Sequence, residues 1–422
     1  MICAILRMGS TLSLRVYYDQ PQVRGGERLT GRVCLRVHSD DTVHATELRL
    51  RFHGRENVMV RVREHSNDHS GRNKSTHAHT VEYSSTHDVS SFETVLSRFD
   101  SRAFLRKGDY VFPFAFDMPV GSPSSFSYEF PNGSRCSLRY TCSAAMTQPG
   151  AMWGTSQSVS DEAEIVVQGP HHPVDESPYV LGPRLDPVFF CCCWKTGSVF
   201  SGVSVNTATA SNGDTLRLTV ALENHSKSTI VAVEVVLSEH ISCHALNHST
   251  DKVVQKFHLR LSPDQLAGRA SIQVAPKEGS AGSLDYAQEQ EVLARLAASL
   301  RAKEPHQVES AGGIGVPVAQ CSSDYTGQNV TIRHSLEVRV VTPACVSTPS
   351  HSASVYIQAP PPLPAGLPGS SLPQHVAAFW VAAEVAVAQP SAPPADWSPQ
   401  VVESLPIASP VVLSGYTVSN KY

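Results

Sequence analysis

The sequence predicts an all-β protein made of two antiparallel β-sandwich domains in tandem, with one inserted helix and a disordered, proline-rich tail. Many short segments alternate apolar and polar residues, as strands with one buried face do. Gly, Asn, Asp, Ser and Pro cluster between these segments, where turns are expected. The order of segments then repeats after about 190 residues, which is the length of a domain rather than of a solenoid repeat. Many short strands joined by polar turns favour β-sandwiches.

The composition fits a protein with two modest hydrophobic cores. A chain of 422 residues is too long for a single core, and 41% of its residues are hydrophobic. Its formal net charge is only -4, and it contains no long run of Lys or Arg. The sequence therefore lacks the basic surface that is expected of a protein that binds nucleic acid.

The sequence also predicts where the protein works. No apolar stretch reaches the roughly 18 residues that a membrane-spanning helix needs. The first residues, Met1 to Arg7, hold too short an apolar stretch for a secretory signal, and no charged residue precedes it. We therefore predict a cytoplasmic protein without a transmembrane segment, whose ten cysteines are thiols rather than a disulfide framework.

The predicted strands fall into two domains joined by a short junction. The first domain spans residues 8–169, the junction residues 170–196 and the second domain residues 197–358. Alternation is clearest in six segments: residues 12–16, 33–37, 48–52, 216–222, 231–237 and 336–340. Three of these segments lie in each domain, so each domain is expected to bury one face of several strands.

Matched segments indicate that the two domains share a topology. Gly26-Glu27 follows the first strand of one domain, and Gly213-Asp214 follows the first strand of the other. Near the end of each domain comes a second match, between residues 138–142 and residues 332–336. The repetition indicates two sandwiches with the same order of strands.

Two stretches interrupt the strand pattern. Residues 63–90 are polar and rich in His and Ser, and are expected to form a long flexible loop. Its histidines, such as His77 and His79, could be taken for a metal site, but no cysteine or carboxylate is spaced to complete it. Residues 284–302 are predicted to be a helix, because Val292 and Leu296 begin an apolar stripe along one face.

Beyond the second domain, residues 359–422 are rich in Pro, Ala and Ser and are predicted to be disordered. Pro360, Pro361, Pro362, Leu363 and Pro364 form a polyproline II segment at the start of this tail. It is either a stiff spacer or a ligand for a WW or SH3 domain. Within this tail, residues 374–388 could form a short apolar helix that docks on a partner, on a membrane surface as peripheral association, or on the chain's own sandwich.

Three consecutive cysteines, Cys191, Cys192 and Cys193, lie in the junction. Small residues that pack a domain junction are the first interpretation, and palmitoylation of an exposed cysteine is the second. Zinc fits poorly, because adjacent residues of a strand point to alternate faces and cannot converge on one ion. No metal site and no cofactor site is predicted.

Three ordered segments carry a resemblance to a known family. Residues 24–27 (RGGE) with 31–33 (GRV) are similar to a Gly-Glu turn that is followed by a Gly-x-Val strand. Residues 112–119 (FPFAFDMP) with 122–126 (SPSSF) are close to the signature PF.F.LP...P.SF. Residues 191–197 (CCCWKTG) resemble a Cys-rich, Gly-containing domain junction. In this order and at domain spacing, the segments resemble the arrestin superfamily, and within it the α-arrestin (arrestin-domain-containing) branch.

The resemblance implies arrestin-type, immunoglobulin-like sandwiches and a cytosolic adaptor or scaffold. Such a protein links membrane-protein cargo to endocytic or endosomal sorting, and is recruited to the plasma membrane or endosomes. The implied partners are cytoplasmic segments of membrane proteins and trafficking machinery. Many α-arrestins also recruit WW-domain ubiquitin ligases through Pro-Pro-x-Tyr, which this tail lacks. The departure puts the ligase connection in doubt, and leaves the predicted fold unchanged.

Two other functions stay open at this point. One is a retromer-like or coat structural subunit in vesicle transport. The other is a secreted or surface sandwich protein. The cysteines and the Asn-x-Ser/Thr sequons at Asn132 and Asn247 favour this alternative. No nucleophile elbow, phosphate loop or zinc-protease spacing occurs in the sequence, so we predict that the protein is not an enzyme.

Overall fold

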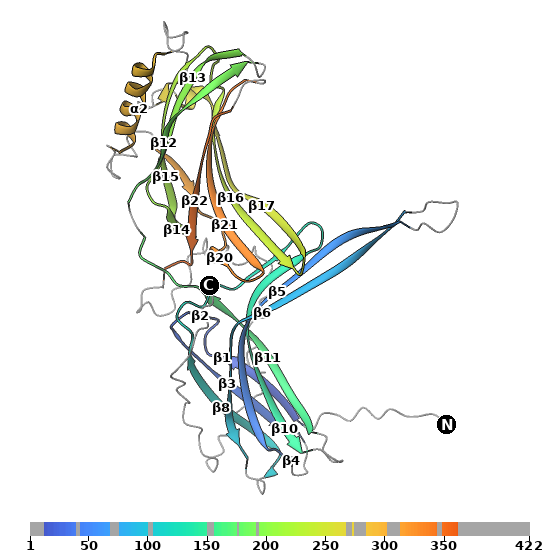
Figure 1. Cartoon of the computed structure of the whole chain (residues 1–422). Coiled ribbons are helices and arrows are strands. Elements are labelled where there is room, and N and C mark those ends of the chain that lie inside the picture. The colour runs from blue at the N-terminus through green and yellow to red at the C-terminus, as the bar shows by residue number, and fades with distance from the viewer. Residues whose placement is uncertain are drawn as a thin grey trace, which may run out of the picture. The chain divides into compact units, whose positions relative to one another are not determined.

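The computed structural model describes eleven stretches of the chain: residues 12–38, 43–67, 76–99, 104–149, 156–174, 177–190, 194–266, 272–273, 284–301, 313–343 and 348–361. These residues form two compact units, one made chiefly of residues up to 170 and one made chiefly of residues from 171 onward (Figure 1). Both units consist mostly of antiparallel strands stacked as two sheets. The predicted all-β sandwich fold is confirmed.

Unit 1 is a sandwich of a three-stranded and a larger sheet. Its strands are β1 (Leu12–Tyr18), β2 (Gln22–Arg24), β3 (Arg28–Val37), β4 (Val43–His44), β5 (Glu47–Asn67), β6 (Thr76–Arg98), β7 (Phe104–Leu105), β8 (Gly108–Asp117), β9 (Phe126–Glu129), β10 (Arg135–Pro149) and β11 (Ser156–Gln168). One sheet has the order β1-β3-β8, and the other has the order β2-β11-β10-β5-β6, with β9 also paired to β10. β4 and β7 form a separate small ladder.

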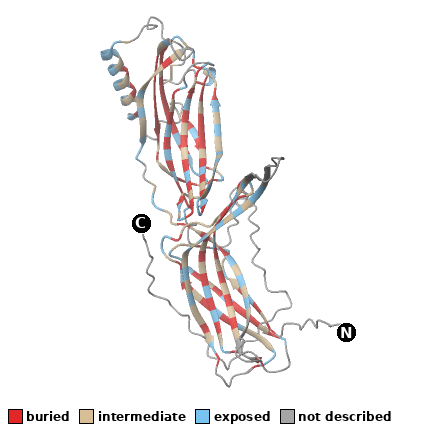
Figure 2. Cartoon of the chain, turned by 45° about the vertical axis from the view of Figure 1, so that its right-hand side comes forward, coloured by how far each residue is buried: buried red, intermediate tan, exposed pale blue. Residues whose placement is uncertain are grey.

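The core of unit 1 is formed by inward-facing residues from both sheets, and buried and exposed residues alternate along the strands (Figure 2). Phe52 lies at its centre, with its ring 5.1 Å from that of Phe116 and 5.9 Å from that of Tyr140. Phe112, Phe114 and Phe116 explain the most specific sequence motif, since all three side chains of β8 are buried in this core. Such aromatic packing supplies much of the hydrophobic stabilisation of a small sandwich.

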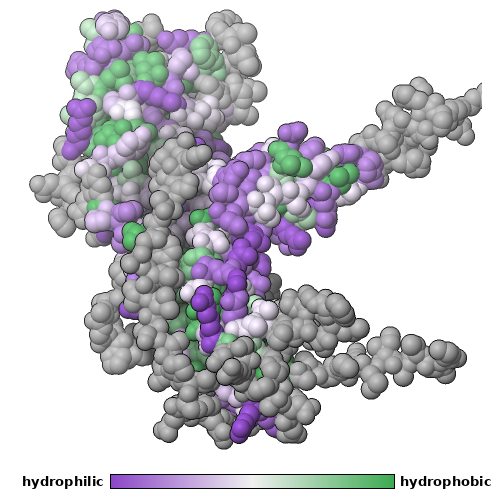
Figure 3. Space-filling model, turned by 60° about the horizontal axis from the view of Figure 1, so that its bottom comes forward, coloured by the Kyte–Doolittle hydropathy of each residue, from purple (hydrophilic) through white to green (hydrophobic). Residues whose placement is uncertain are grey.

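Residues 63–90, predicted to be a loop, are largely part of a hairpin, so that prediction is wrong. β5 continues to Asn67 and β6 begins at Thr76, and the two pair along their whole length. β10 pairs with β5 only as far as Met59, so the rest is a two-stranded ribbon. Cross-strand contacts such as Arg61–Glu82 (2.7 Å) join its strands. On the face shown in Figure 3 the hairpin is mostly hydrophilic with scattered apolar residues, which explains why apolar alternation failed to reveal it.

Unit 2 repeats this architecture and adds to it. Its elements are β12 (Tyr179–Phe190), β13 (Trp194–Val205), β14 (Thr209–Ser211), β15 (Thr215–Ser226), β16 (Ala232–Ala245), β17 (His248–Leu261), α1 (Pro263–Leu266), β18 (Ile272–Gln273), α2 (Tyr286–Arg301), β19 (Ile314–Pro317), β20 (Tyr325–Thr326), β21 (Val330–Val341) and β22 (Ser350–Gln358). One sheet has the order β12-β13-β15-β18, with β19 on β15; the other has the order β14-β22-β21-β16-β17, with β20 on β21.

The predicted helix over residues 284–302 is confirmed as α2. It begins at a capping box, in which the backbone N–H of Gln288 donates to Asp285 Oδ1 (2.8 Å) and the Asp285 N–H donates to Gln288 Oε1 (3.1 Å). Its apolar stripe, Val292, Leu296 and Leu300, is buried. The stripe packs against β12, β13 and β15 (Figure 1).

Repeated hydrogen bonds account for the repeated sequence. Gly26 has φ of 85° and its N–H donates to the Met118 carbonyl; Gly213 has φ of 99° and its N–H donates to the Val318 carbonyl. These turns favour glycine, because other residues rarely adopt positive φ. Just before each turn a short strand pairs in parallel with the last strand of its unit, β2 with β11 and β14 with β22. Two sandwiches of one topology therefore follow each other along the chain.

Candidate functional site

The outer edge of β1 is the candidate binding site of unit 1. Among the described strands, none pairs with β1 on the side away from β3, so β1 ends its sheet. Its register with β3 runs from Leu12 opposite Val37 to Tyr18 opposite Gly31 without a shift. The other edges are less regular, since β6 has two register shifts against β5 and β8 contains Pro113. Bulges and proline are features that make an edge a poor partner for another strand.

Alternate residues of β1 direct their backbone groups to this edge. The Asp19 N–H donates to the Thr30 carbonyl of β3 (3.1 Å), so odd-numbered residues face β3. Because successive residues of a strand point their amides in opposite directions, those of Leu14, Val16 and Tyr18 face the open edge. Such a row of backbone donors and acceptors can pair with an added strand.

One carboxylate covers the middle of this edge. Asp161 of β11 accepts a hydrogen bond from the Val16 N–H through Oδ2 (2.8 Å) and one from Arg15 through Oδ1 (3.2 Å). Nearby, the Tyr18 hydroxyl donates to the Ala163 carbonyl (2.8 Å). Burial raises the pKa of Tyr18, so this hydroxyl keeps its proton. Asp161 of β11 thus occupies part of an edge that carries no paired strand among the described residues.

Positive charge lies beside the β1 edge. The Arg15 side chain is 68% exposed, although it contacts Asp161. Arg32 is exposed on β3 and is the cross-strand neighbour of Tyr17. Because Arg15 and Arg32 lie on the same face of the sheet, an extended segment added to β1 would have both guanidinium groups within reach, and acidic side chains would complement them.

In unit 2 the equivalent edge carries a strand. β13 pairs with β15 as β1 pairs with β3, and on its other side β13 pairs with β12. The β12–β13 register extends from Tyr179 opposite Val205 to Phe190 opposite Trp194. β12 lies within residues 170–196, the stretch predicted to be the junction. The chain therefore contains one example of an extended segment added at this position of the fold.

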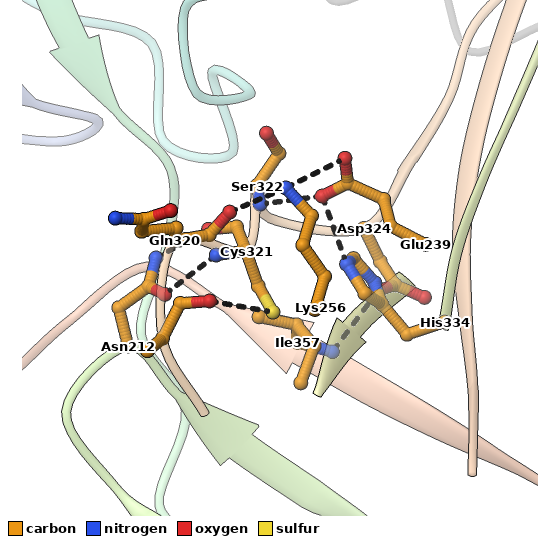
Figure 4. A network of polar contacts seen from close by, with 10 residues as sticks. Asn212, Glu239, Lys256, Gln320, Cys321, Ser322, Asp324, His334 and Ile357 are labelled. Carbon is orange, nitrogen blue, oxygen red and sulfur yellow. Dashed lines mark hydrogen bonds and ion pairs between the residues drawn. The ribbon is translucent and has the colours of Figure 1, made fainter. Parts of the chain in front are cut away.

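Unit 2 also holds a buried ionic network (Figure 4). The ring of His334 on β21 contacts Asp324 through Nδ1 (2.7 Å) and Glu239 of β16 through Nε2 (3.1 Å). Lys256 of β17 lies 3.2 Å from the same Glu239 carboxylate. The side chains of Glu239 and His334 are fully buried. With both basic groups protonated, the two positive charges balance the two carboxylates, as a buried site requires.

Paired charges override burial in setting the pKa values of this network. Burial alone would lower the pKa of His334, but its hydrogen bonds with Asp324, Cys321 and Glu239 raise it to about 10. Burial would likewise raise the pKa of Glu239, but hydrogen bonds from His334 and the Ser322 N–H, together with the Lys256 charge, lower it to about 2. At neutral pH the ring is therefore an imidazolium between carboxylates.

The network acts as a structural clamp within unit 2. Reactive cysteines in Cys–His groupings are partly exposed, whereas buried cysteines are usually structural. Cys321 is buried, and its thiol lies 3.5 Å from the Ala319 carbonyl. What the network does is join β16, β17 and β21 to the segment that precedes β20, since the Ser322 N–H donates to Glu239 (2.9 Å).

Unit 1 holds a neutral counterpart of this clamp. Tyr140 of β10 stands opposite Gly54 of β5, just as His334 stands opposite Glu239. The Tyr140 hydroxyl donates to the Pro123 carbonyl (2.9 Å) and so ties the segment after β8 to the sheet. The same position of the duplicated fold is thus held by a tyrosine in one unit and by charges in the other.

The residues next to each clamp also correspond. In unit 1 the Val167 N–H donates to Ser125 Oγ (3.0 Å), and the Ser125 N–H donates to the Val167 carbonyl (2.8 Å). In unit 2 the Ile357 N–H donates to Asp324 Oδ1 (3.0 Å), and the Asp324 N–H donates to the Ile357 carbonyl (2.6 Å). Asp324 therefore replaces Ser125 and supplies the charge that His334 needs.

Gly54→Ala is expected to destabilise unit 1 by about 1–3 kcal/mol, because an added methyl group overpacks the core. A Cβ at Gly54 would lie 2.3 Å from Cε1 of the Tyr140 ring. Urea denaturation monitored by hydrogen exchange of the unit 1 strands measures the loss. In a Tyr140→Ala background the same substitution should cost much less, and equal costs in both backgrounds would contradict the proposed clash.

The sequence-predicted site residues are placed only in part. Pro360 and Pro361 come after β22, separated from its last residue by Ala359, and Pro361 is exposed. Pro362, Leu363 and Pro364 lie outside the described residues, as do Cys191, Cys192 and Cys193.

Within the described stretches, no group of three or more His, Cys, Asp or Glu side chains is arranged to hold a metal ion. No helix in the part of the chain that the structure describes is long and apolar enough to cross a membrane.

The sequence analysis missed both the β1 edge and the buried ionic network. Only the network has a feature in the sequence that could have revealed it. Glu239 falls at the inward register of β16, between the buried Leu237 and Ile241. His334 likewise falls between the buried Ile332 and Leu336. Two ionisable residues at core positions of segments with clear alternation predict a buried pair. Asp161 left no comparable signal, because its partner Val16 is about 145 residues away and contributes only a backbone amide.

The sequence of unit 1 matches a known protein family. Residues 14–169 match the model of the arrestin (or S-antigen) N-terminal domain. The matched stretch contains most of β1 and all of β2 to β11. The β1 edge, its Asp161 cover and the Tyr140 clamp therefore all lie inside the matched domain.

Proposed function

Because its first unit is an arrestin N-terminal domain, the chain belongs to the arrestin superfamily, and from this premise we propose that it is a cytoplasmic adaptor for membrane-protein cargo. It binds extended cytoplasmic segments of membrane proteins and links them to endocytic or endosomal sorting. An arrestin-like adaptor role in general agrees with the fold, which offers sheet edges rather than a catalytic centre. The protein is then recruited to the plasma membrane or to endosomes by its cargo.

The observation that carries the proposal is the open edge of β1. Strand addition supplies affinity through main-chain hydrogen bonds and specificity through alternate side chains. β12 on β13 is the internal precedent, because it fills the equivalent edge of unit 2. The proposed cargo segment pairs with β1 and displaces Asp161 from the Val16 N–H. Arg15 and Arg32 favour a segment that carries acidic side chains.

Asp161→Ala is expected to strengthen binding of an acidic, extended peptide about 2–5-fold, since a partly exposed ion pair contributes about 0.2–1 kcal/mol. The substitution frees the Val16 N–H and the guanidinium of Arg15. Fluorescence anisotropy with a labelled Glu-containing peptide measures the change. Weaker binding by Asp161→Ala would show that the carboxylate belongs to the binding surface rather than covering it.

Affinity capture from cells tests the proposed function itself. We expect the full chain to recover membrane proteins, and a variant with Arg15→Glu and Arg32→Glu to lose them. Arg139→Glu is the matched control, because Arg139 lies on β10 of the same unit and pairs with Glu164 (3.8 Å) away from β1. Equal recovery of membrane proteins by the double variant and the control would rule out the β1 edge. Recovery of no membrane protein or trafficking component by the full chain would rule out the adaptor role.

Two segments extend the proposal to further partners. The polyproline segment Pro360–Pro364 begins just after β22, where a WW or SH3 domain could bind it, and a WW domain could bring a ubiquitin ligase. Palmitoylation within Cys191–Cys193 would add peripheral membrane association. Capture of the full chain with and without residues 360–364 tests the first idea. Metabolic labelling with a palmitate analogue, compared with a triple Cys→Ser variant, tests the second.

A further inference from the structure

α2 covers an apolar patch that is separate from the main core of unit 2. Phe200 and Ala221 are fully buried and pack with Val292, Leu296 and Leu300 of the helix. Their strand neighbours Val199 and Val220 belong to the main core instead. Because side chains alternate along a strand, Phe200 and Ala221 face the opposite side of the sheet. The outer face of β13 and β15 is therefore apolar where α2 lies on it.

The patch is shaped and charged to match a helix. A Cβ at Gly202 would lie 2.6 Å from Leu300 Cδ1, so the absence of a side chain there leaves the space that the leucine fills. Beside the patch, Glu223 of β15 accepts two hydrogen bonds from Arg295 Nη2 (2.7 and 2.9 Å). His225 contacts the same carboxylate at 3.2 Å. The surface thus contacts three aliphatic residues of the helix spaced four positions apart, Val292, Leu296 and Leu300. It also binds one arginine, Arg295, which lies between the first two.

The attachment of α2 is nevertheless slight. Three of its sixteen residues are buried, while most of the others are exposed or half-buried. Among the described residues, the Nδ1 atom of the buried His225 has no hydrogen-bond partner, so this polar atom of the covered surface is left unsatisfied there. Elements with few buried apolar contacts open at much lower free energy than the strands beneath them.

We propose that α2 is a displaceable cover and that the surface beneath it docks an amphipathic helix of a partner protein. The partner helix carries the α2 pattern, with aliphatic residues at positions i, i+4 and i+8 and an arginine at i+3. Helices recognised in apolar grooves use such spacing, because it places their anchors on one face. This second surface goes beyond the proposed binding of extended segments at β1, since it recognises another secondary structure on the other unit.

Hydrogen exchange of the full chain tests whether α2 is displaceable. We expect the amides of α2 to exchange at least about 100-fold faster than those of β13 and β15, because local opening precedes unfolding of the strands. Exchange of α2 at the same rate as these strands would overturn the proposal, since the helix would then open only with the unit.

A peptide of residues 284–302 tests the docking surface directly. In the full chain, Leu296→Glu should release the chain's own helix, and the labelled peptide should then bind in trans more tightly than to the unmodified protein. Adding Glu223→Arg should abolish this binding, and a peptide with Arg295→Glu should restore it.

Hydrogen exchange of β16 and β21 checks that each variant keeps its core. No binding by a folded Leu296→Glu variant, or no rescue by the charge exchange, would contradict the proposal. Concentration-dependent dimers that exchange α2 would show that the occupant is a second copy of this chain.

Discussion

Replacing Glu239 by alanine is expected to lower the free energy of unfolding of unit 2 by about 3–5 kcal/mol, the usual cost of breaking a buried ion pair from one side. The substitution leaves Asp324 as the one carboxylate that contacts His334 among the described residues, and it removes the carboxylate that lies 3.2 Å from Lys256. It also removes the acceptor of the Ser322 N–H. Urea titration followed by hydrogen exchange of β16 and β21 reports this unit separately from unit 1.

Two further variants separate charge burial from simple loss of a side chain. Glu234 lies on the same strand and pairs with the exposed Arg260 (2.9 Å), so Glu234→Ala should cost at most about 1 kcal/mol. Exchanging three members of the network for their unit 1 counterparts, with Glu239→Gly, His334→Tyr and Asp324→Ser, should recover much of the loss, because Lys256, whose side chain is 14% exposed, is then the one charged member left. A triple variant no more stable than Glu239→Ala would show that the two clamps are not interchangeable.

The stability of unit 2 is expected to be highest between about pH 4.5 and 6.5 and to fall as the pH rises toward 10. The pKa of His334 is raised from 6.5 to about 10, so its contribution is complete below pH 6.5 and lost as pH passes through the folded value. The pKa of Glu239 is lowered from 4.5 to about 2, so its contribution is lost as pH falls from 4.5 toward 2. A pKa that differs by one between the folded and the unfolded protein corresponds to about 1.4 kcal/mol, so the change in stability reaches several kcal/mol.

Measuring thermal or urea stability from about pH 3 to pH 10 tests this profile. Other groups titrate in the same range, among them the buried thiols of unit 1, where burial raises the pKa of Cys34 to about 11. The difference between the unmodified protein and the triple variant with His334→Tyr isolates the network. That difference should shrink steadily above pH 6.5, the ordinary pKa of histidine. A difference that stays constant up to about pH 10 would mean that His334 is neutral in the folded protein.

Much of the fold follows from the sequence because both units bury one face of their strands. Alternation around Leu216 and Val233 marks strands of unit 2, and positive-φ glycines mark the turns at Gly26 and Gly213. The helix α2 was also predictable, since its stripe and its capping box at Asp285 are local features. The extended hairpin was not, because its strands carry few apolar residues beyond Val62 and so show no apolar period.

The candidate sites follow from the sequence to very different degrees. His334 and Glu239 interrupt apolar registers and could have been identified as a buried pair. The β1 edge could not, because whether a strand ends a sheet depends on which other strands pair with it. Likewise, the role of Asp161 depends on the packing of β11 against β1, which brings a carboxylate to a backbone amide far away in the sequence. Such contacts are properties of the folded sandwich and of no local motif.

Hydrogen exchange of β1 with a captured cargo segment bound is the most direct test of the adaptor proposal. Strand addition predicts protection with a period of two residues, at the amides of Leu14, Val16 and Tyr18, because these face the open edge. The amides of Arg15 and Tyr17 already face β3 and should change little. Protection with this alternation would support an added strand on β1. Unchanged exchange along β1 in a saturated complex, or uniform protection of both sets, would contradict it.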